Sequence, residues 1–255
     1  MTQLRLLFPY PVFQVDFFES NTPYSCTNGY FEQLKDTIDD MRLKDPMGRK
    51  ISNTGWQSND GCERHPAFQQ LMRKIKTIFD GDVLPYFGLD TSKAQMVMGT
   101  AWANVNDKGA WNKPHLHNGC WYSGAIYIKA DGDEGMLNII DKDIQVGSDS
   151  PHSERSRSSW DFIPRTGRAL FFPSGLMHMV EPNQTNKDRY SISFNIDVKY
   201  MVEGVDFGEI ENYNPNEFLF DLDEKGNPIT HTTKQVLETW KIIRNNIPSN
   251  NWTEN

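Results

Sequence analysis

The feature that most constrains the fold is a series of short β segments between about residues 94 and 198, separated by Gly, Pro and Asn turns. The expected strands are 95–105, 121–129, 136–140, 169–172, 178–180 and 189–198. Several short strands at this spacing are typical of a β-sandwich or barrel. The sequence therefore predicts a mainly β core.

Helices are expected before this core. A short strand over 11–19 opens the chain, and an amphipathic helix follows Thr27, with apolar residues at a 3.6-residue period, ending before Pro46. A second apolar stripe starts at Pro66 and ends at Asp80 and Gly81. A further helix is expected after Thr233, near the end of the chain.

Composition limits the class of protein. With 255 residues, of which 37% are hydrophobic, the chain has enough apolar side chains for one large domain. Its 26 basic and 34 acidic residues leave a net charge of -8, which disfavours nucleic acid as a partner. Three cysteines match no zinc or redox spacing, and no run of 18 apolar residues occurs. We expect a cytoplasmic protein with no membrane partner.

A polar insertion without periodicity lies between Gln145 and Thr166 and carries Arg155 and Arg157. Such a segment is either a solvated surface loop or a lid that contacts a substrate, because long loops in compact domains often have a function. Both interpretations remain open from the sequence.

Three histidines have the placement of metal ligands. His115 and His117 are two residues apart in an extended segment, so both imidazoles point to the same side of the chain. His178 begins another expected strand, and the returning strand carries Arg189 and Ser191 on one face, with apolar residues on the other. If the polar face lines the barrel interior, the arginine can hold a carboxylate near the histidines.

The order His115-x-His117, His178, Arg189-x-Ser191, together with the small-residue strand 123–127, resembles the Fe(II)/2-oxoglutarate-dependent dioxygenases. The likeness is greatest to the prolyl-4-hydroxylase-like branch and, within it, to a group of oxygenases of bacteria and phages. It covers about residues 94–200, and the segment 54–58 and the paired helices agree with it.

The resemblance implies a double-stranded β-helix, that is a jelly-roll, cupin-like core with flanking helices. We expect a single oxygenase domain over 1–255, made of a strand and two supporting helices (1–93), the jelly-roll core (94–200) and a C-terminal extension with a helix (201–255). The implied activity is that of a hydroxylase that uses Fe(II), 2-oxoglutarate and O2 and releases succinate and CO2.

The resemblance also implies roles for individual residues. His115 and His178 become iron ligands, and Arg189 with Ser191 binds the far carboxylate of 2-oxoglutarate. Tyr127 either donates its hydroxyl to the same carboxylate or is a core aromatic. Asn138 is expected to contact the cosubstrate. The expected substrate contacts are Trp102, Asn104, Trp121, Arg155 and Arg157, although any of the aromatic residues can equally fill the core.

One position departs from the family pattern, which has Asp or Glu where this chain has His117. Three neutral histidines can also bind iron on one face, so we expect His115, His117 and His178 to be the ligands. The alternative is a carboxylate from elsewhere, with Asp141 and Asp143 as the nearest candidates. In that case His117 orients the ligands through hydrogen bonds.

Two rival functions follow from the same residues. A cupin-like three-histidine oxygenase needs the metal but not 2-oxoglutarate, and it has no need of Arg189. A non-enzymatic jelly-roll binding protein predicts that His115, His117 and His178 do not converge in space. The fold does not select the substrate, which can be a small molecule or a peptide, and the oligomeric state stays open, a homodimer included.

Overall fold

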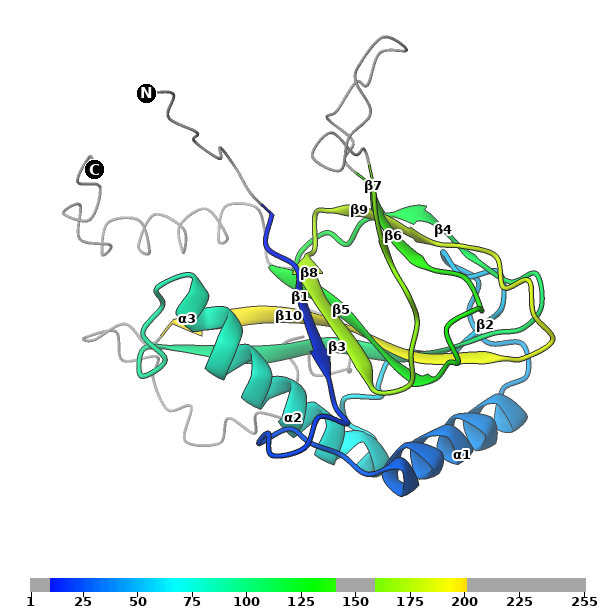
Figure 1. Ribbon diagram of the computed structural model, residues 1–255, viewed down its shortest axis with the longest axis horizontal. Coiled ribbons are helices and arrows are strands. Elements are labelled where there is room, and N and C mark those ends of the chain that lie inside the picture. Colours follow the sequence, from blue (N-terminus) through cyan, green and yellow to red (C-terminus); the bar gives the residue numbers. More distant parts are fainter. Residues whose placement is uncertain (1–9, 141–158, 201–255) are drawn as a thin grey trace, which may run out of the picture. The chain divides into compact units, whose positions relative to one another are not determined.

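The fold consists of two antiparallel β-sheets and two main helices (Figure 1), in a computed structural model that describes residues 10–140 and 159–200. The larger sheet has the order β1-β8-β5-β10-β3-β2. Its strands are β1 (Phe13–Asp16), β2 (Trp56–Gln57), β3 (Ala94–Asn106), β5 (Tyr122–Lys129), β8 (Arg168–Pro173) and β10 (Arg189–Tyr200). The smaller sheet, β4-β9-β6-β7, contains β4 (Asn112–His115), β6 (Leu137–Ile140), β7 (Ser159–Phe162) and β9 (Met177–Val180).

The strand order confirms the predicted jelly roll. From β3 to β10 the chain alternates between the two sheets, except at the β6–β7 pair, which stays in the smaller sheet. All pairings are antiparallel. The result is a mainly β, double-stranded β-helix, in which two sheets face each other and the space between them can hold a site.

Both predicted helices are present. Helix α1 (Asn28–Lys44) begins after Thr27, whose side chain accepts the Tyr30 N–H at 3.3 Å. The second helical segment opens with a 3-10 turn at Pro66–Phe68 and continues as α2 (Gln69–Ile78). It does not stop at Asp80 as predicted, because a π turn (Phe79–Val83) and α3 (Leu84–Tyr86) extend it to bury further apolar side chains.

The main hydrophobic core lies between the helices and the larger sheet, and the smaller sheet lies over the opposite face of the larger one (Figure 1). Tyr190, Ile192 and Phe194 of β10 belong to this core. Since side chains alternate along a strand, Arg189 and Ser191 point to the other face, between the two sheets. The polar face of β10 therefore lines the interior, as the sequence argument required.

Some predictions need correction, and others lie outside the described residues. The end of the predicted polar insertion forms β7, which pairs with β6, and the short strands β2 and β4 were not predicted. Residues 141–158 and the expected C-terminal helix lie outside the described part. The described residues fall within one compact unit, Met1–Asn216, and a single domain over 1–255 remains a prediction. None of the described helices is long and apolar enough to cross a membrane.

Candidate metal and cosubstrate site

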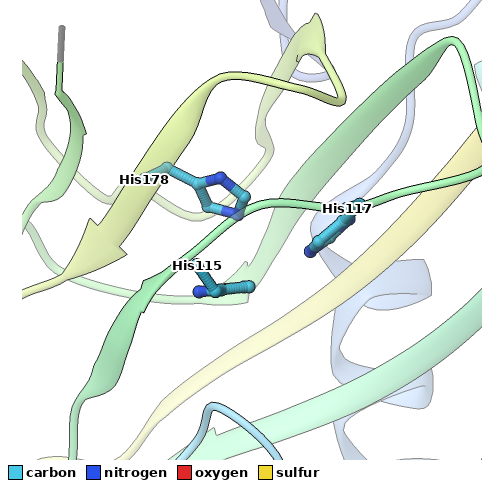
Figure 2. A group of neighbouring side chains, drawn as sticks. All are labelled: His115, His117 and His178. Atoms are coloured by element: carbon cyan, nitrogen blue, oxygen red, sulfur yellow. The ribbon is translucent and has the colours of Figure 1, made fainter. Parts of the chain in front are cut away.

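Three histidines from two strands and one connecting segment converge between the sheets. His115 ends β4 and lies directly opposite His178 of β9 in the strand register. His117 follows in the segment after β4, where its backbone N–H donates to the Ser174 carbonyl at 2.9 Å. One ring nitrogen from each histidine lies within 4.8 Å of the other two. Figure 2 shows the three imidazole rings turned toward a common space.

Hydrogen bonds to the backbone fix the rings of His115 and His178. Nδ1 of His115 lies 2.6 Å from the Lys113 carbonyl oxygen, and Nδ1 of His178 lies 2.9 Å from the Leu176 carbonyl oxygen. A carbonyl oxygen only accepts, so Nδ1 carries the proton in both rings. The lone pair is then on Nε2, which is the arrangement found for histidines that bind metals.

The third ring, of His117, is held by side chains. Its Nδ1 lies 2.7 Å from Oδ1 of Asn195 and 2.8 Å from Oγ of Ser123. Asn195 comes from β10 and Ser123 from β5, and the two side chains also bond to each other at 2.9 Å. With Asn195 as the acceptor, Nε2 of His117 is also left with its lone pair.

Burial lowers the pKa of all three histidines, and that of His178 falls to about 3. They are therefore neutral at pH 7, and neutral imidazole is the form that binds metal ions. No described carboxylate or cysteine joins this cluster. Asp141 and Asp143, the alternative ligands, lie outside the described residues. The three nitrogens fit a divalent transition metal.

The cavity beside the histidines is also lined by a second group of polar side chains. Its lining includes all three histidines and also Tyr127, Arg189 and Ser191. Trp102 and Asn104, two of the expected substrate contacts, line it as well. The sequence therefore indicated residues that the fold brings to one cavity from β3, β5 and β10.

Arg189 is a buried cation to which the described residues supply no carboxylate partner. The residue is only 2% exposed, and its Nη1 donates to the carbonyl oxygens of Glu134 at 2.5 Å and Gly135 at 2.8 Å. Within the described residues it forms no ion pair, and burial lowers its pKa. A buried, unpaired guanidinium is costly, so the site fits a ligand that brings a carboxylate.

Tyr127 supplies a second unsatisfied group. Its hydroxyl is buried and has no hydrogen-bond partner among the described residues. Burial raises its pKa, with the nearby Arg189 charge opposing this shift, so the phenol remains protonated and can donate. Buried hydroxyls normally have a partner. The orphaned hydroxyl and the unpaired guanidinium together fit the carboxylate of a dicarboxylic ligand such as 2-oxoglutarate.

Two predicted site residues lie elsewhere. Asn138 does not line the cavity: it lies on the opposite face of β6 from Leu137, and its amide donates to Asp161 at 2.7 Å. Trp121 packs in an aromatic cluster, with its ring 5.0 Å from that of Phe87, and it is not among the residues that line either cavity. The structure thus gives no support to the expected contacts of Asn138 and Trp121 with the site. Arg155 and Arg157 lie outside the described residues.

Sequence reasoning missed a network of amides at the site. Asn53 donates to Oδ1 of Asn104 at 3.2 Å, and Asn104 donates to Oγ of Ser193 at 3.1 Å. The side chain of Asn106 also joins, donating to Oδ1 of Asn53 at 3.1 Å. Asn53 precedes the β core by 41 residues, so no spacing rule connects it with Asn104.

A second, outer cleft adjoins the same histidines. It shares Ser52, Trp102, His115 and His117 with the inner cavity and adds Thr100 and Asn195. The ring centres of Trp102 and His117 are 5.6 Å apart. The histidine cluster thus lies between an inner cavity that contains the arginine and an outer cleft whose walls carry both polar and apolar groups.

Comparison with solved structures finds proteins of similar fold. Among solved structures, a prolyl-4-hydroxylase from Pseudomonas putida is similar at 15% identity and a TM-score of 0.47, covering 73% of this chain and 92% of that chain. AviO1 from Streptomyces viridochromogenes Tue57 is similar at 12% identity and a TM-score of 0.48, covering 68% of this chain and 86% of that chain.

The carbocyclase SnoK from nogalamycin biosynthesis, described as non-heme and alpha ketoglutarate dependent, has 12% identity and a TM-score of 0.49, covering 87% of this chain and 90% of its own. No curated protein sequence matches the chain. Residues 100–195 match a family model described as "Putative 2OG-Fe(II) oxygenase". This matched segment holds all three histidines, Tyr127 and Arg189.

Proposed function

We propose that this protein is an Fe(II)- and 2-oxoglutarate-dependent oxygenase that hydroxylates a C–H bond of a peptide or small molecule. One observation carries the proposal. A cluster of three neutral histidines and a pair of unsatisfied carboxylate-binding groups, Arg189 and Tyr127, line the same cavity. A metal site alone does not need the second group, whereas a keto acid that chelates the metal and carries a distal carboxylate needs both.

His115, His117 and His178 would hold the metal through Nε2. The chemistry supplied by Fe(II) with 2-oxoglutarate and O2 is insertion of one oxygen atom into the substrate, coupled to formation of succinate and CO2. The residues of the chain supply orientation: Lys113 and Leu176 carbonyls fix two of the rings, so the ligand geometry exists before the metal binds.

Arg189, Tyr127 and Ser191 would bind the distal carboxylate of 2-oxoglutarate. Arg189 offers a planar donor pair, and Tyr127 adds a neutral O–H donor. These groups are buried, so their hydrogen bonds form without competition from bulk water. With its distal carboxylate held by these groups, the keto-acid end of the cosubstrate would face the histidines that line the same cavity.

The outer cleft is the proposed substrate site. Trp102 lines both the cleft and the inner cavity, so a substrate that contacts its indole lies next to His117. The cleft walls also carry Arg49 and Asp60, which pair with each other at 2.7 Å, and Lys113, which is exposed. This mixture of groups suits a polar small molecule or a peptide segment.

The three-histidine cluster also supports a second candidate, a cupin-like oxygenase that does not use 2-oxoglutarate. His117 in place of a carboxylate favours this alternative. The unpaired Arg189 and the orphaned Tyr127 hydroxyl argue against it, because both remain unexplained without an anionic cosubstrate. The convergence of the histidines is contrary to the expectation for a non-enzymatic jelly roll.

The test is metal content together with 2-oxoglutarate turnover. We expect the purified protein to bind one Fe(II) and to convert 2-oxoglutarate slowly to succinate without a substrate. His115→Ala and His178→Ala should each abolish this turnover, while Asp161→Ala, at a residue on the outer face of the smaller sheet, should not. Full iron occupancy in both histidine variants, measured by elemental analysis, would refute the ligand assignment.

A further inference from the structure

The turn between β5 and β6 is organised by a buried carboxylate. Glu134 is 1% exposed, and it forms no ion pair with a described lysine or arginine. Its Oε1 accepts the Asp131 N–H at 2.9 Å, and its Oε2 accepts the N–H groups of Gly132 at 3.0 Å and Asp133 at 3.2 Å. Successive backbone N–H groups of this kind form a nest that stabilises an anion. The carboxylate therefore fixes the conformation of its own turn.

The same turn holds the guanidinium of Arg189. The carbonyl oxygens of Glu134 and Gly135 both accept from Nη1, at 2.5 and 2.8 Å. Gly135 has φ +90°, and a Cβ there would lie 2.5 Å from the Glu181 carbonyl oxygen, so the backbone has no freedom to move toward β9. The Glu181 N–H donates to the Met136 carbonyl at 2.9 Å, and the Met136 N–H donates to Oε2 of Glu181 at 3.0 Å, which ties the turn to the residue after β9. The two carbonyl groups are thus held on both sides.

This arrangement uses only part of the donor capacity of the arginine. A guanidinium has five N–H donors, and the two on Nη1 are occupied. Neither Nε nor Nη2 of Arg189 has a hydrogen-bond partner among the described residues, and the residue lines the cavity. With Nη1 fixed, the free edge of the planar group has one orientation only.

We propose that Glu134 is a positioning residue: its carboxylate sets the turn that aims the free edge of Arg189 at the distal carboxylate of the cosubstrate. The inference rests on the proposed use of 2-oxoglutarate and adds a residue that does not itself line the cavity. Its negative charge also favours the charged form of Arg189. Neighbouring Asp131 and Asp133 have a different role, since they pair with exposed Lys187 at 2.9 and 3.6 Å.

The experiment measures binding of two keto acids to the full chain loaded with Mn(II), by calorimetric titration. The probes are 2-oxoglutarate and 2-oxopentanoate, which has the same chain length but lacks the distal carboxylate. In Glu134→Ala the dissociation constant for 2-oxoglutarate should rise about tenfold, which corresponds to one charge-assisted hydrogen bond. Binding of 2-oxopentanoate and of Mn(II) should stay unchanged, so the preference for the dicarboxylate falls about tenfold.

Two further variants separate positioning from stability. Glu134→Gln keeps one acceptor oxygen for the nest and should recover part of the preference. Asp133→Ala removes an equal charge from the same turn and should leave the preference intact. Circular dichroism checks that each variant is folded. If Glu134→Ala does not fold, Glu134→Gln alone decides: a reduced preference for the dicarboxylate supports the inference, and an unchanged preference contradicts it.

An unchanged preference in the folded Glu134 variants, or an equal loss for both keto acids, would overturn this inference. Arg189→Ala distinguishes that result from a failure of the proposed function. If Arg189→Ala abolishes the preference and Glu134→Ala does not, only the positioning role is wrong. If the wild-type protein has no preference for the dicarboxylate, the proposed cosubstrate itself is wrong.

Discussion

Replacing Tyr127 by phenylalanine removes one oxygen atom from a buried ring and leaves the packing of the ring intact. The hydroxyl is buried and lacks a hydrogen-bond partner among the described residues. In the protein without cosubstrate, the hydroxyl is therefore a desolvated group with no compensation. In the complex with 2-oxoglutarate it donates to a carboxylate. The substitution thus has opposite effects on the two states.

The magnitudes follow from these two environments. An unsatisfied buried hydroxyl costs about 1–3 kcal/mol, so Tyr127→Phe should stabilise the cosubstrate-free protein by at least about 1 kcal/mol. For a domain of this size that corresponds to an increase in Tm of about 2–4 °C. A hydrogen bond to a charged group contributes about 1.5–3 kcal/mol, so the affinity for 2-oxoglutarate should fall at least about tenfold.

The assay combines thermal unfolding without cosubstrate and calorimetric titration of 2-oxoglutarate with Mn(II) bound. A matched control is Tyr122→Phe, at a residue of the same strand whose hydroxyl donates to the Pro11 carbonyl at 3.2 Å. The control should lose stability and keep its affinity for 2-oxoglutarate. Reduced stability of Tyr127→Phe with unchanged affinity would show that Tyr127 is a core aromatic, and the cosubstrate contact would be refuted.

Three further predictions concern the histidines. His117→Asp should retain the metal, because it restores the commoner family pattern, whereas His117→Ala should lose much of the affinity for the metal. A metal titration that finds wild-type affinity in His117→Ala would contradict the three-histidine site. Mn(II) at about 100 times its Kd should add about 2.7 kcal/mol to the free energy of unfolding, and this gain should disappear in His115→Ala. An equal gain in the wild-type protein and in His115→Ala would contradict the role of His115 as a ligand. The pKa of His178 is about 3 in the folded protein, below the ordinary 6.5, so the unfolded chain binds more protons between these values. The metal-free protein should therefore lose stability as the pH falls from about 6.5 to about 3, by up to about 1.4 kcal/mol per pH unit for this residue, and a pH dependence that is equal in His178→Gln would refute this origin.

Local patterns were sufficient to predict most of the fold. The apolar stripe of α1 and its Thr27 cap follow from helical periodicity, and the long strands β3, β5 and β10 follow from their apolar alternation and turn residues. The two-residue strand β2 and the four-residue strand β7 are too short to produce a recognisable pattern. They exist because neighbouring strands offer free backbone groups, which is information that comes only from the assembled sheets.

Candidate site residues were predictable where the chemistry of binding restricts both the residue types and their spacing. They were not predictable where contacts between distant parts of the chain determine which residues meet. His115, His178 and Arg189 were found because metal and carboxylate binding restrict the residue types and their order. For Asn138 the sequence was not sufficient, because a four-residue strand does not establish which residues of β6 line the cavity, and the structure has Leu137 there instead. Glu134 carries no such signal, since a lone Glu in a turn is usually solvated, and only the three backbone bonds to it show otherwise.

The most direct test of the account is the affinity for 2-oxoglutarate of the wild-type protein and of Arg189→Ala, both loaded with Mn(II), measured by calorimetric titration. Loss of a buried, charge-assisted contact costs about 2–5 kcal/mol, so the affinity should fall at least about thirtyfold while Mn(II) binding persists. Arg189→Lys should recover only part of this loss, because an ammonium lacks the planar donor pair. Equal affinities of the wild-type protein and Arg189→Ala would contradict the account and favour a three-histidine oxygenase that does not use 2-oxoglutarate.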